Sequence, residues 1–378
     1  MEMAYESKAG AADHAGAAQA RHIYLIALAL ALAYLLVIVH ASVQPWRGWR
    51  LPPEDMYGFL TAPWPPYISL RDVAINLAAY IPFGFLLALA LRLALPVPWA
   101  VLTAVLLACA LTVAMESVQM FLPARIPSNV DVLSNSLGAL IGALAAPLFL
   151  PSGVLGAWLG GWRDRLFVPG ALADVGIVIV ALWIAANLNP LTQVFGTGLL
   201  RDTFDLPALP DHTPTRLLTS EAAVVFFNLL GIGLLLSAVL NTHRHRGRVI
   251  MLVIAAAIAV KMLIFVLLGK PHGAWAWMTP GVLLGLVMGG TLLFGLLPLA
   301  LGARLGLALL ATLLALAAIN FAPENPYFSP PPPLATGRPS HFLSLSGILR
   351  AVSELWPLLA LSYLSAALWT RGRRAPNV

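Results

Sequence analysis

The stretch that decides the fold runs from residue 69 to residue 142. It begins with SLRDVAINLAAYIPFG at residues 69–84 and ends with ESVQMFLPARIPSNVDVLSNSLGALIG at residues 116–142. Both ends have the composition of apolar helices, yet charged and amide side chains recur inside them. A charged side chain at the centre of a membrane-spanning helix costs about 2.5–3.5 kcal/mol. The polar groups of this stretch therefore require an explanation by pairing, ligand binding or chemistry.

The composition of the whole chain is that of a membrane protein. Of its 378 residues, 60% are hydrophobic and only 10% are charged, whereas soluble domains carry about 25% charged residues. Apolar runs recur along the sequence, and each is long enough to cross a bilayer core of about 30 Å as a helix. We therefore predict an all-α, polytopic helical bundle with about ten transmembrane helices. The runs lie near residues 22–41, 70–92, 98–122, 131–150, 171–190, 219–240, 248–269, 279–300, 304–322 and 345–370.

Basic residues predict the orientation of these helices. Arg92, the HRHRGR run at 243–248 and the RGRR run at 371–374 fall on one side of the predicted topology. The positive-inside rule makes that side cytoplasmic and places both termini there. This asymmetry accounts for the net charge of +6, so we expect membrane lipids, and not nucleic acid, as partners. Lys261 falls within a span, where we expect its ammonium group to extend toward the interface, with pairing to a glutamate as the alternative.

An internal repeat predicts the domain organisation. Asn228 in the second part of the chain echoes Asn76 in the first, and the glycines of 281–285 echo the GxxxG element at 138–142, which suits close helix contact. The repeat predicts a 4+4+2 arrangement of helices. Its parts are a disordered cytoplasmic tail at 1–21, a four-helix domain at 22–150, a degenerate second four-helix unit at 151–300, and a two-helix unit with a basic tail at 301–378.

The pattern SxxDVxxN occurs twice, at residues 69–76 and 128–135. Serine followed by an acid three residues later is a capping box, which marks the start of a helix. The Asn four residues after each Asp lies one turn deeper on the same helical face. Two such pairs predict a polar pocket near the outer interface, whereas helix capping alone is the alternative explanation of the Ser–Asp pairs.

Glu116 and Gln119 lie one turn apart near the outer end of their helix, and Arg125 follows in the next loop. One interpretation is an intramembrane clamp that holds helices together. The other is a ligand site in which Arg71 and Arg125 bind a phosphate or carboxylate. The predicted ligand-binding residues are Arg71, Asp72, Asn76, Glu116, Gln119, Arg125, Asp131 and Asn135, and the candidates for acid or base catalysis are Glu116, Asp131 and Asp72.

The sequence argues against several other kinds of site. It contains no P-loop, no dinucleotide-binding fingerprint and no HExxH motif. Its single cysteine, Cys109, excludes an intrachain disulfide and a thiolate cluster. We therefore predict neither a metal site nor a cofactor.

The ordered set of motif residues resembles the VanZ-like family over about residues 25–150. The resemblance rests on the stretches DVAINLAAYIPFG and ESVQMFLPARIPSNVDVLSNSLGALIG. The family's namesake is associated with low-level resistance to the glycopeptide teicoplanin. The resemblance implies a protein of the bacterial cytoplasmic membrane that acts in the cell envelope, in antibiotic resistance or in envelope biogenesis.

Three classes of function stay open at this point. The first is a protein that binds a lipid, or a lipid-linked cell-wall or polysaccharide intermediate, at the outer-facing polar pocket. The second is an integral-membrane enzyme acting on such an intermediate, and the third is a transporter, which internal repeats would suit. The sequence does not decide whether the protein is an enzyme, and it does not fix an oligomeric state.

Overall fold

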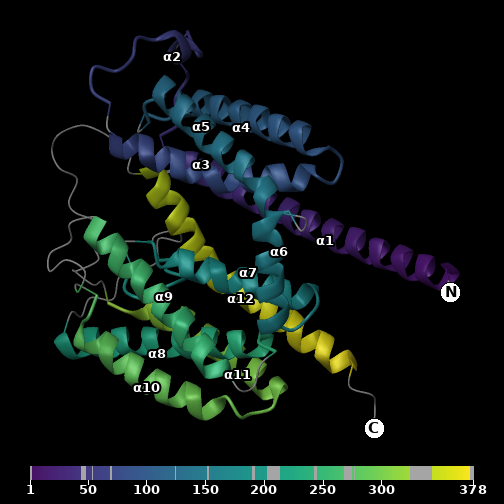
Figure 1. Cartoon of the computed structure of the whole chain (residues 1–378). Helices are drawn as coiled ribbons and strands as arrows, with labels where there is room; N and C mark the ends of the chain where they lie inside the picture. Colours follow the sequence, from purple (N-terminus) through teal and green to yellow (C-terminus); the bar gives the residue numbers. More distant parts are fainter. Residues whose placement is uncertain are drawn as a thin grey trace. The chain divides into compact units, whose positions relative to one another are not determined.

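The structure is a computed structural model that describes most of the chain. It leaves undescribed residues 1, 44–47, 53, 69, 124, 151–152, 190–191, 202–212, 242–244, 268–274, 276, 324–342 and 375–378, and within helices the side chains of 2–19, 22, 71, 267, 343–348 and 374. The elements in order are α1 (Glu2–Val43), α2 (Gly58–Thr61), α3 (Leu70–Leu91), α4 (Val97–Gln119), α5 (Asn129–Ala145), η1 (Ala146–Phe149), α6 (Val154–Leu166), α7 (Ala171–Ala186), α8 (Pro214–Val239), α9 (Arg246–Leu267), α10 (Pro280–Leu296), α11 (Leu301–Phe321) and α12 (Leu343–Arg374) (Figure 1).

The predicted fold class is confirmed. Eight of the described helices are long and apolar enough to cross a membrane: α1, α3, α4, α5 with η1, α8, α9, α11 and α12. Two further apolar helices, α7 and α10, have 16 and 17 residues. Each of the ten predicted runs thus corresponds to an apolar helix. The protein is an all-α, polytopic membrane protein.

Two segments differ from the sequence prediction. Residues 1–21 were predicted to be disordered, but from Glu2 onward they form the start of α1. This stretch is rich in alanine, which has the highest helix propensity of the residues, and polarity alone was a poor guide to its structure. The second segment is α6, a helix of 13 residues that is too short to span a bilayer and was not predicted.

The composition of α6 suits a membrane interface. Trp158 and Trp162 on this helix are more than half exposed, and their rings lie 5.6 Å apart. Arg163 and Arg165 occupy its last turn. Exposed tryptophan next to arginine on a short helix is typical of segments that lie in the headgroup region.

The chain divides into two compact units, the first of Met1–Trp162 with Gly337–Ile348 and the second of Arg163–Thr336 with Leu349–Val378. In the first unit, α3 packs against α1, α4 and α5. Glycines bring α3 and α5 together: a Cβ added at Gly138 would lie 2.2 Å from Leu77 O, and one added at Gly142 would lie 2.0 Å from Ile81 O. No side chain fits at these distances, so the GxxxG element serves close helix contact as predicted.

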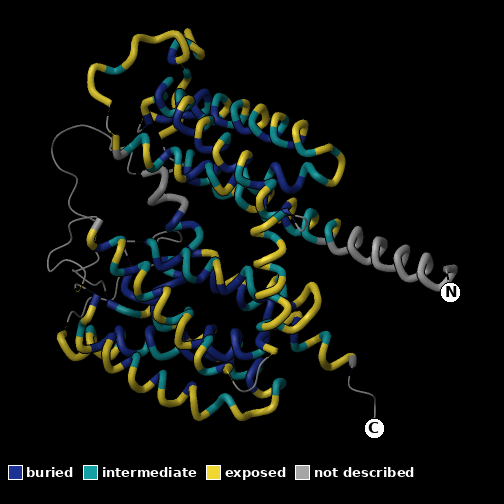
Figure 2. Tube along the Cα trace, in the orientation of Figure 1, coloured by how far each residue is buried: buried dark blue, intermediate teal, exposed yellow. Residues whose placement is uncertain are grey.

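In the second unit, α8 is the enclosed central helix, with α10 and α11 packed on it. Within the apolar window of α8, 78% of residues are buried, against 22% for α9, and Figure 2 shows the buried colour over much of α8 after its exposed first turns. Glycines again mediate the main contact, because a Cβ at Gly285 would lie 2.6 Å from Ala222 O. The pair α8–α10 therefore packs in the manner of α3–α5. The predicted 4+4+2 repeat stays a prediction.

The segment between α7 and α8 is buried where the structure describes it, from residue 192 to residue 201. Two of its backbone N–H groups donate to side chains of the second unit. Phe195 N donates to Asn187 Oδ1 at 3.0 Å, and Leu200 N donates to Asn320 Oδ1 at 2.9 Å. Irregular backbone inside a membrane protein requires such partners, because no water is available to it.

Lys261 lies in the second half of α9 and is paired inside the second unit. Its side chain is fully buried, and its Nζ donates a hydrogen bond of 2.6 Å to Asn189 O. The ammonium group also faces the ring of Phe265 at 5.4 Å. Lys261 therefore binds within the second unit, at a backbone carbonyl that follows the end of α7.

Candidate functional site

The start of α5 is capped by side chains from two elements. Ser128 is the N-cap residue, and its hydroxyl accepts a hydrogen bond of 3.2 Å from Val130 N. The N–H of Ser128 itself donates to Glu116 Oε2 at 3.0 Å. In a capping box this second bond is made by the acid at the third helical position, which here is Asp131. The prediction that Ser128 caps a helix is confirmed, but Glu116 of α4 supplies the carboxylate at the Ser128 N–H.

Asp131 joins α5 to α3. Its Oδ1 accepts a hydrogen bond of 2.8 Å from Asn76 Nδ2. Asn76 is buried, whereas Asp131 is half-buried. The structure therefore brings the two SxxDVxxN segments together, and it pairs the amide of the first segment with the acid of the second.

Arg125 lies in the loop between α4 and α5 and contacts α1. Its Nη2 donates to Ala41 O at 2.8 Å, and the residue is only 9% exposed. Burial lowers the pKa of the Arg125 guanidinium, while the charges of Glu116 and Asp131 raise it. Arg125 remains charged at neutral pH because the ordinary pKa of arginine lies so high. The two carboxylates lie close enough to Arg125 to compensate its buried charge.

Asn135 lies one turn deeper in α5. Its Nδ2 donates a hydrogen bond of 2.9 Å to Thr112 Oγ1 of α4, and Tyr80 of α3 lies near the Thr112 hydroxyl. Sequence reasoning missed Thr112 and Tyr80, although one lies a turn before Glu116 and the other a turn after Asn76. The Oδ1 of Asn135 is buried and accepts no hydrogen bond from the residues that the structure describes.

These residues belong to a stretch that matches a known family. Residues 23–150 match the family VanZ/LLP1. The match covers α1 from Ile23, α2, α3, α4, α5 and η1, and confirms the resemblance that the motif residues indicated. We refer to this part of the chain as the VanZ-like domain. No curated protein and no solved structure matches the chain.

The VanZ-like domain places most of the predicted site residues in one polar cluster. Gln119 is buried at the last position of α4, and Asp72 is half-buried in the first turn of α3. The side chain of Arg71 lies outside the described residues. Within the described residues, no group of three or more His, Cys, Asp or Glu side chains could hold a metal ion. We define the polar cluster as Asn76, Tyr80, Thr112, Glu116, Arg125, Ser128, Asp131 and Asn135.

Proposed function

We propose that the VanZ-like domain binds a lipid, or a lipid-linked cell-wall or polysaccharide intermediate, at the polar cluster. The observation that carries this proposal is the buried acceptor Asn135 Oδ1, which has no hydrogen-bond partner among the described residues. A buried polar group left in this state costs about 1–3 kcal/mol. A hydroxyl or amide group of a ligand, such as a sugar hydroxyl, removes this cost by donating to Oδ1.

The charges of the cluster suit an anionic, hydroxyl-rich head group. Arg125 supplies a guanidinium, which binds phosphate or carboxylate through paired hydrogen bonds. Asp131 is half-buried next to Asn76, so its carboxylate is placed to accept from hydroxyl groups of the same ligand. Glu116 holds the start of α5 in position through Ser128.

Binding is favoured over catalysis by the state of the two carboxylates. Glu116 and Asp131 each accept a hydrogen bond from a protein donor. Such bonds hold each carboxylate in a fixed position, which serves recognition more than proton transfer. An enzyme acting on a lipid-linked intermediate, and a transporter, are the alternative outcomes of the test below.

We place this protein in the bacterial cytoplasmic membrane, with both termini in the cytoplasm and the polar cluster toward the outer face. Its basic residues support this orientation through the positive-inside rule. A ligand from the cell wall would connect the VanZ-like domain to envelope biogenesis, and through it to teicoplanin resistance.

The test compares lipids and lipid-linked wall precursors in membranes from cells that lack the protein, overproduce it, or carry Glu116→Gln at equal abundance. Glutamine retains an acceptor for Ser128 N and removes only the charge. Asp164→Asn is the matched control, because Asp164 is an exposed acid on α6, and its side chain is 61% accessible.

We expect a lipid-linked species to co-purify with the wild type and the Asp164→Asn control, and to be depleted from Glu116→Gln. A different result would indicate catalysis or transport: a species that accumulates in cells without the protein and returns to its ordinary level only in cells with the wild type. The same content of lipids and lipid-linked precursors in all membranes, with no species bound to any form of the protein, would refute the proposal. The polar cluster would then be a structural clamp.

A further inference from the structure

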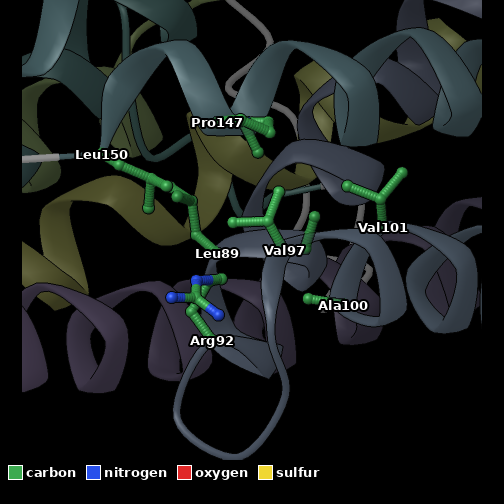
Figure 3. A pocket seen from close by; sticks show the side chains of 9 residues that line it. Leu89, Arg92, Val97, Ala100, Val101, Pro147 and Leu150 are labelled. Atoms are coloured by element: carbon green, nitrogen blue, oxygen red, sulfur yellow. The ribbon is translucent and has the colours of Figure 1, made fainter. Parts of the chain in front are cut away.

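A shallow hollow lies at the other end of the VanZ-like domain, where α3 ends, α4 begins and η1 follows α5. Its walls are apolar apart from one arginine, Arg92, which follows the last residue of α3 (Figure 3). The empty space amounts to about 170 Å³, including the part that is open to solvent. The hollow is lined by Ala88, Leu89, Arg92, Val97, Ala100, Val101, Ala146, Pro147 and Leu150.

Arg92 is incompletely paired in this position. One guanidinium nitrogen donates to Leu95 O, and the guanidinium carbon lies 6.0 Å from the centre of the Tyr24 ring. Its Nε is buried and donates to no acceptor, and no carboxylate among the described residues pairs with it. By contrast, Nη2 of Arg163 lies 2.6 Å from Oδ1 of Asp174, with which it forms an ion pair. A buried donor on a charged group is costly without an acceptor, so the environment of Arg92 favours an anion.

The first turn of α4 adds to the positive potential. The helix begins at Val97, which lines the hollow, and its N-cap residue Pro96 provides no side-chain hydrogen bond. The backbone N–H groups at a helix start carry partial positive charge and favour anions. The side chains that line the hollow around Arg92 are apolar, and Leu93, the next residue along the chain, is 38% exposed. An anion bound here therefore has an apolar surface on both sides.

We propose that this hollow binds an anionic phospholipid, with its phosphate on Arg92 and its glycerol and acyl segments against the apolar walls. A free inorganic anion would gain nothing from the eight apolar residues that line the hollow, whereas a phospholipid uses both features. The end of the domain that carries Arg92 is predicted to be cytoplasmic, and anionic lipids give that leaflet its negative surface potential. This inference does not depend on the function proposed for the polar cluster, which lies at the opposite ends of α3, α4 and α5.

The test is a lipid titration of the purified, delipidated full chain, followed by native mass spectrometry. The probes are palmitoyl-oleoyl phosphatidylglycerol, phosphatidylcholine with the same chains, and inorganic phosphate as a competitor. Arg92→Gln is compared with the wild type and with Arg21→Gln, which removes an exposed arginine three residues before Tyr24. We expect Arg92→Gln to weaken binding of phosphatidylglycerol about fivefold, as the loss of one basic contact to an anionic lipid predicts. Arg21→Gln and the binding of phosphatidylcholine should stay unchanged.

Three results would overturn the proposal. The first is equal binding of phosphatidylglycerol by Arg92→Gln and the wild type. The second is an equal loss in Arg92→Gln and Arg21→Gln, which would indicate diffuse surface charge. The third is displacement of phosphatidylglycerol by millimolar phosphate, which would make the hollow a site for a free anion. Arg92→Lys keeps the positive charge and removes the Nε donor. It replaces Arg92→Gln in the titration if that variant does not fold. We expect it to bind phosphatidylglycerol more weakly than the wild type, and equal binding would count against the proposal.

Discussion

Replacement of Gly142 by alanine should separate α3 from α5 and weaken the VanZ-like domain. The added Cβ would lie 2.0 Å from Ile81 O and 2.8 Å from Phe85 N, which are backbone atoms of α3. Ordinary contact begins at 3.4 Å, so the helices must move apart by about 1.4 Å, the difference between 3.4 and 2.0 Å. If α5 moves as a rigid helix, the hydrogen bond between Asn76 and Asp131 near its other end lengthens from 2.8 Å to at most about 4.2 Å, beyond the range of a hydrogen bond.

The expected loss of stability follows from these two effects. Overpacking of a close contact costs about 1–3 kcal/mol, and an interhelical hydrogen bond in a membrane contributes about 0.6 kcal/mol. Gly142→Ala should therefore lower the free energy of unfolding by about 2–4 kcal/mol. The assay is equilibrium unfolding in mixed micelles with increasing dodecyl sulfate, followed by circular dichroism. Gly161→Ala on α6 is the control, because no atom lies within 4 Å of the added Cβ. Equal stability of Gly142→Ala and the wild type would refute the reasoning.

Three further predictions test other parts of the account. Glu116→Leu should destabilise the protein by about 1–3 kcal/mol because it leaves Ser128 N without an acceptor, whereas Glu116→Gln, which keeps an acceptor but removes a charge beside Arg125, should destabilise it less in the same unfolding assay. Asn187→Ala removes the acceptor of Phe195 N and the donor to Trp183 O, so thermal unfolding should occur at a clearly lower temperature, while Asn129→Ala, whose bond to Ala62 O is exposed, should have little effect. A cysteine placed at Asn129 in a Cys109→Ala background should react with a membrane-impermeant maleimide added outside the cell, and labelling only from the cytoplasm would reverse the predicted topology.

The helices could be predicted from the sequence because length and hydropathy are local properties. Each of the ten apolar runs forms a helix, and the glycines at 138 and 142 indicated the contact that they make with α3. α6 was missed because its 13 residues fall below the length of a membrane span. The N-terminal helix was missed because polarity was given more weight than the helix propensity of alanine.

The pairing within the polar cluster could be predicted only in part. Sequence spacing grouped Asp131 with Asn135 on one helical face, but the partner of Asp131 is Asn76 on another helix. The rotation and register of packed helices decide such a contact, and a single sequence does not reveal them. Thr112 was overlooked because an uncharged hydroxyl within an apolar helix gives no signal in composition. The hydrogen bond from Arg125 to Ala41 O could not be predicted either, because every residue has a backbone carbonyl and the sequence does not indicate which one is used.

The central claim is that the polar cluster binds a ligand through the open acceptor of Asn135, and Asn135→Leu tests it most directly. Leucine has the same branched shape and number of side-chain heavy atoms, removes Oδ1, and gives up only the hydrogen bond to Thr112. The measurement quantifies the lipid-linked species bound to the purified wild type and the variant, together with their unfolding midpoints. We predict that Asn135→Leu loses the bound species while its stability is unchanged or raised. A variant that is less stable but retains the bound species at the wild-type level would contradict the account and identify Asn135 as part of a structural clamp.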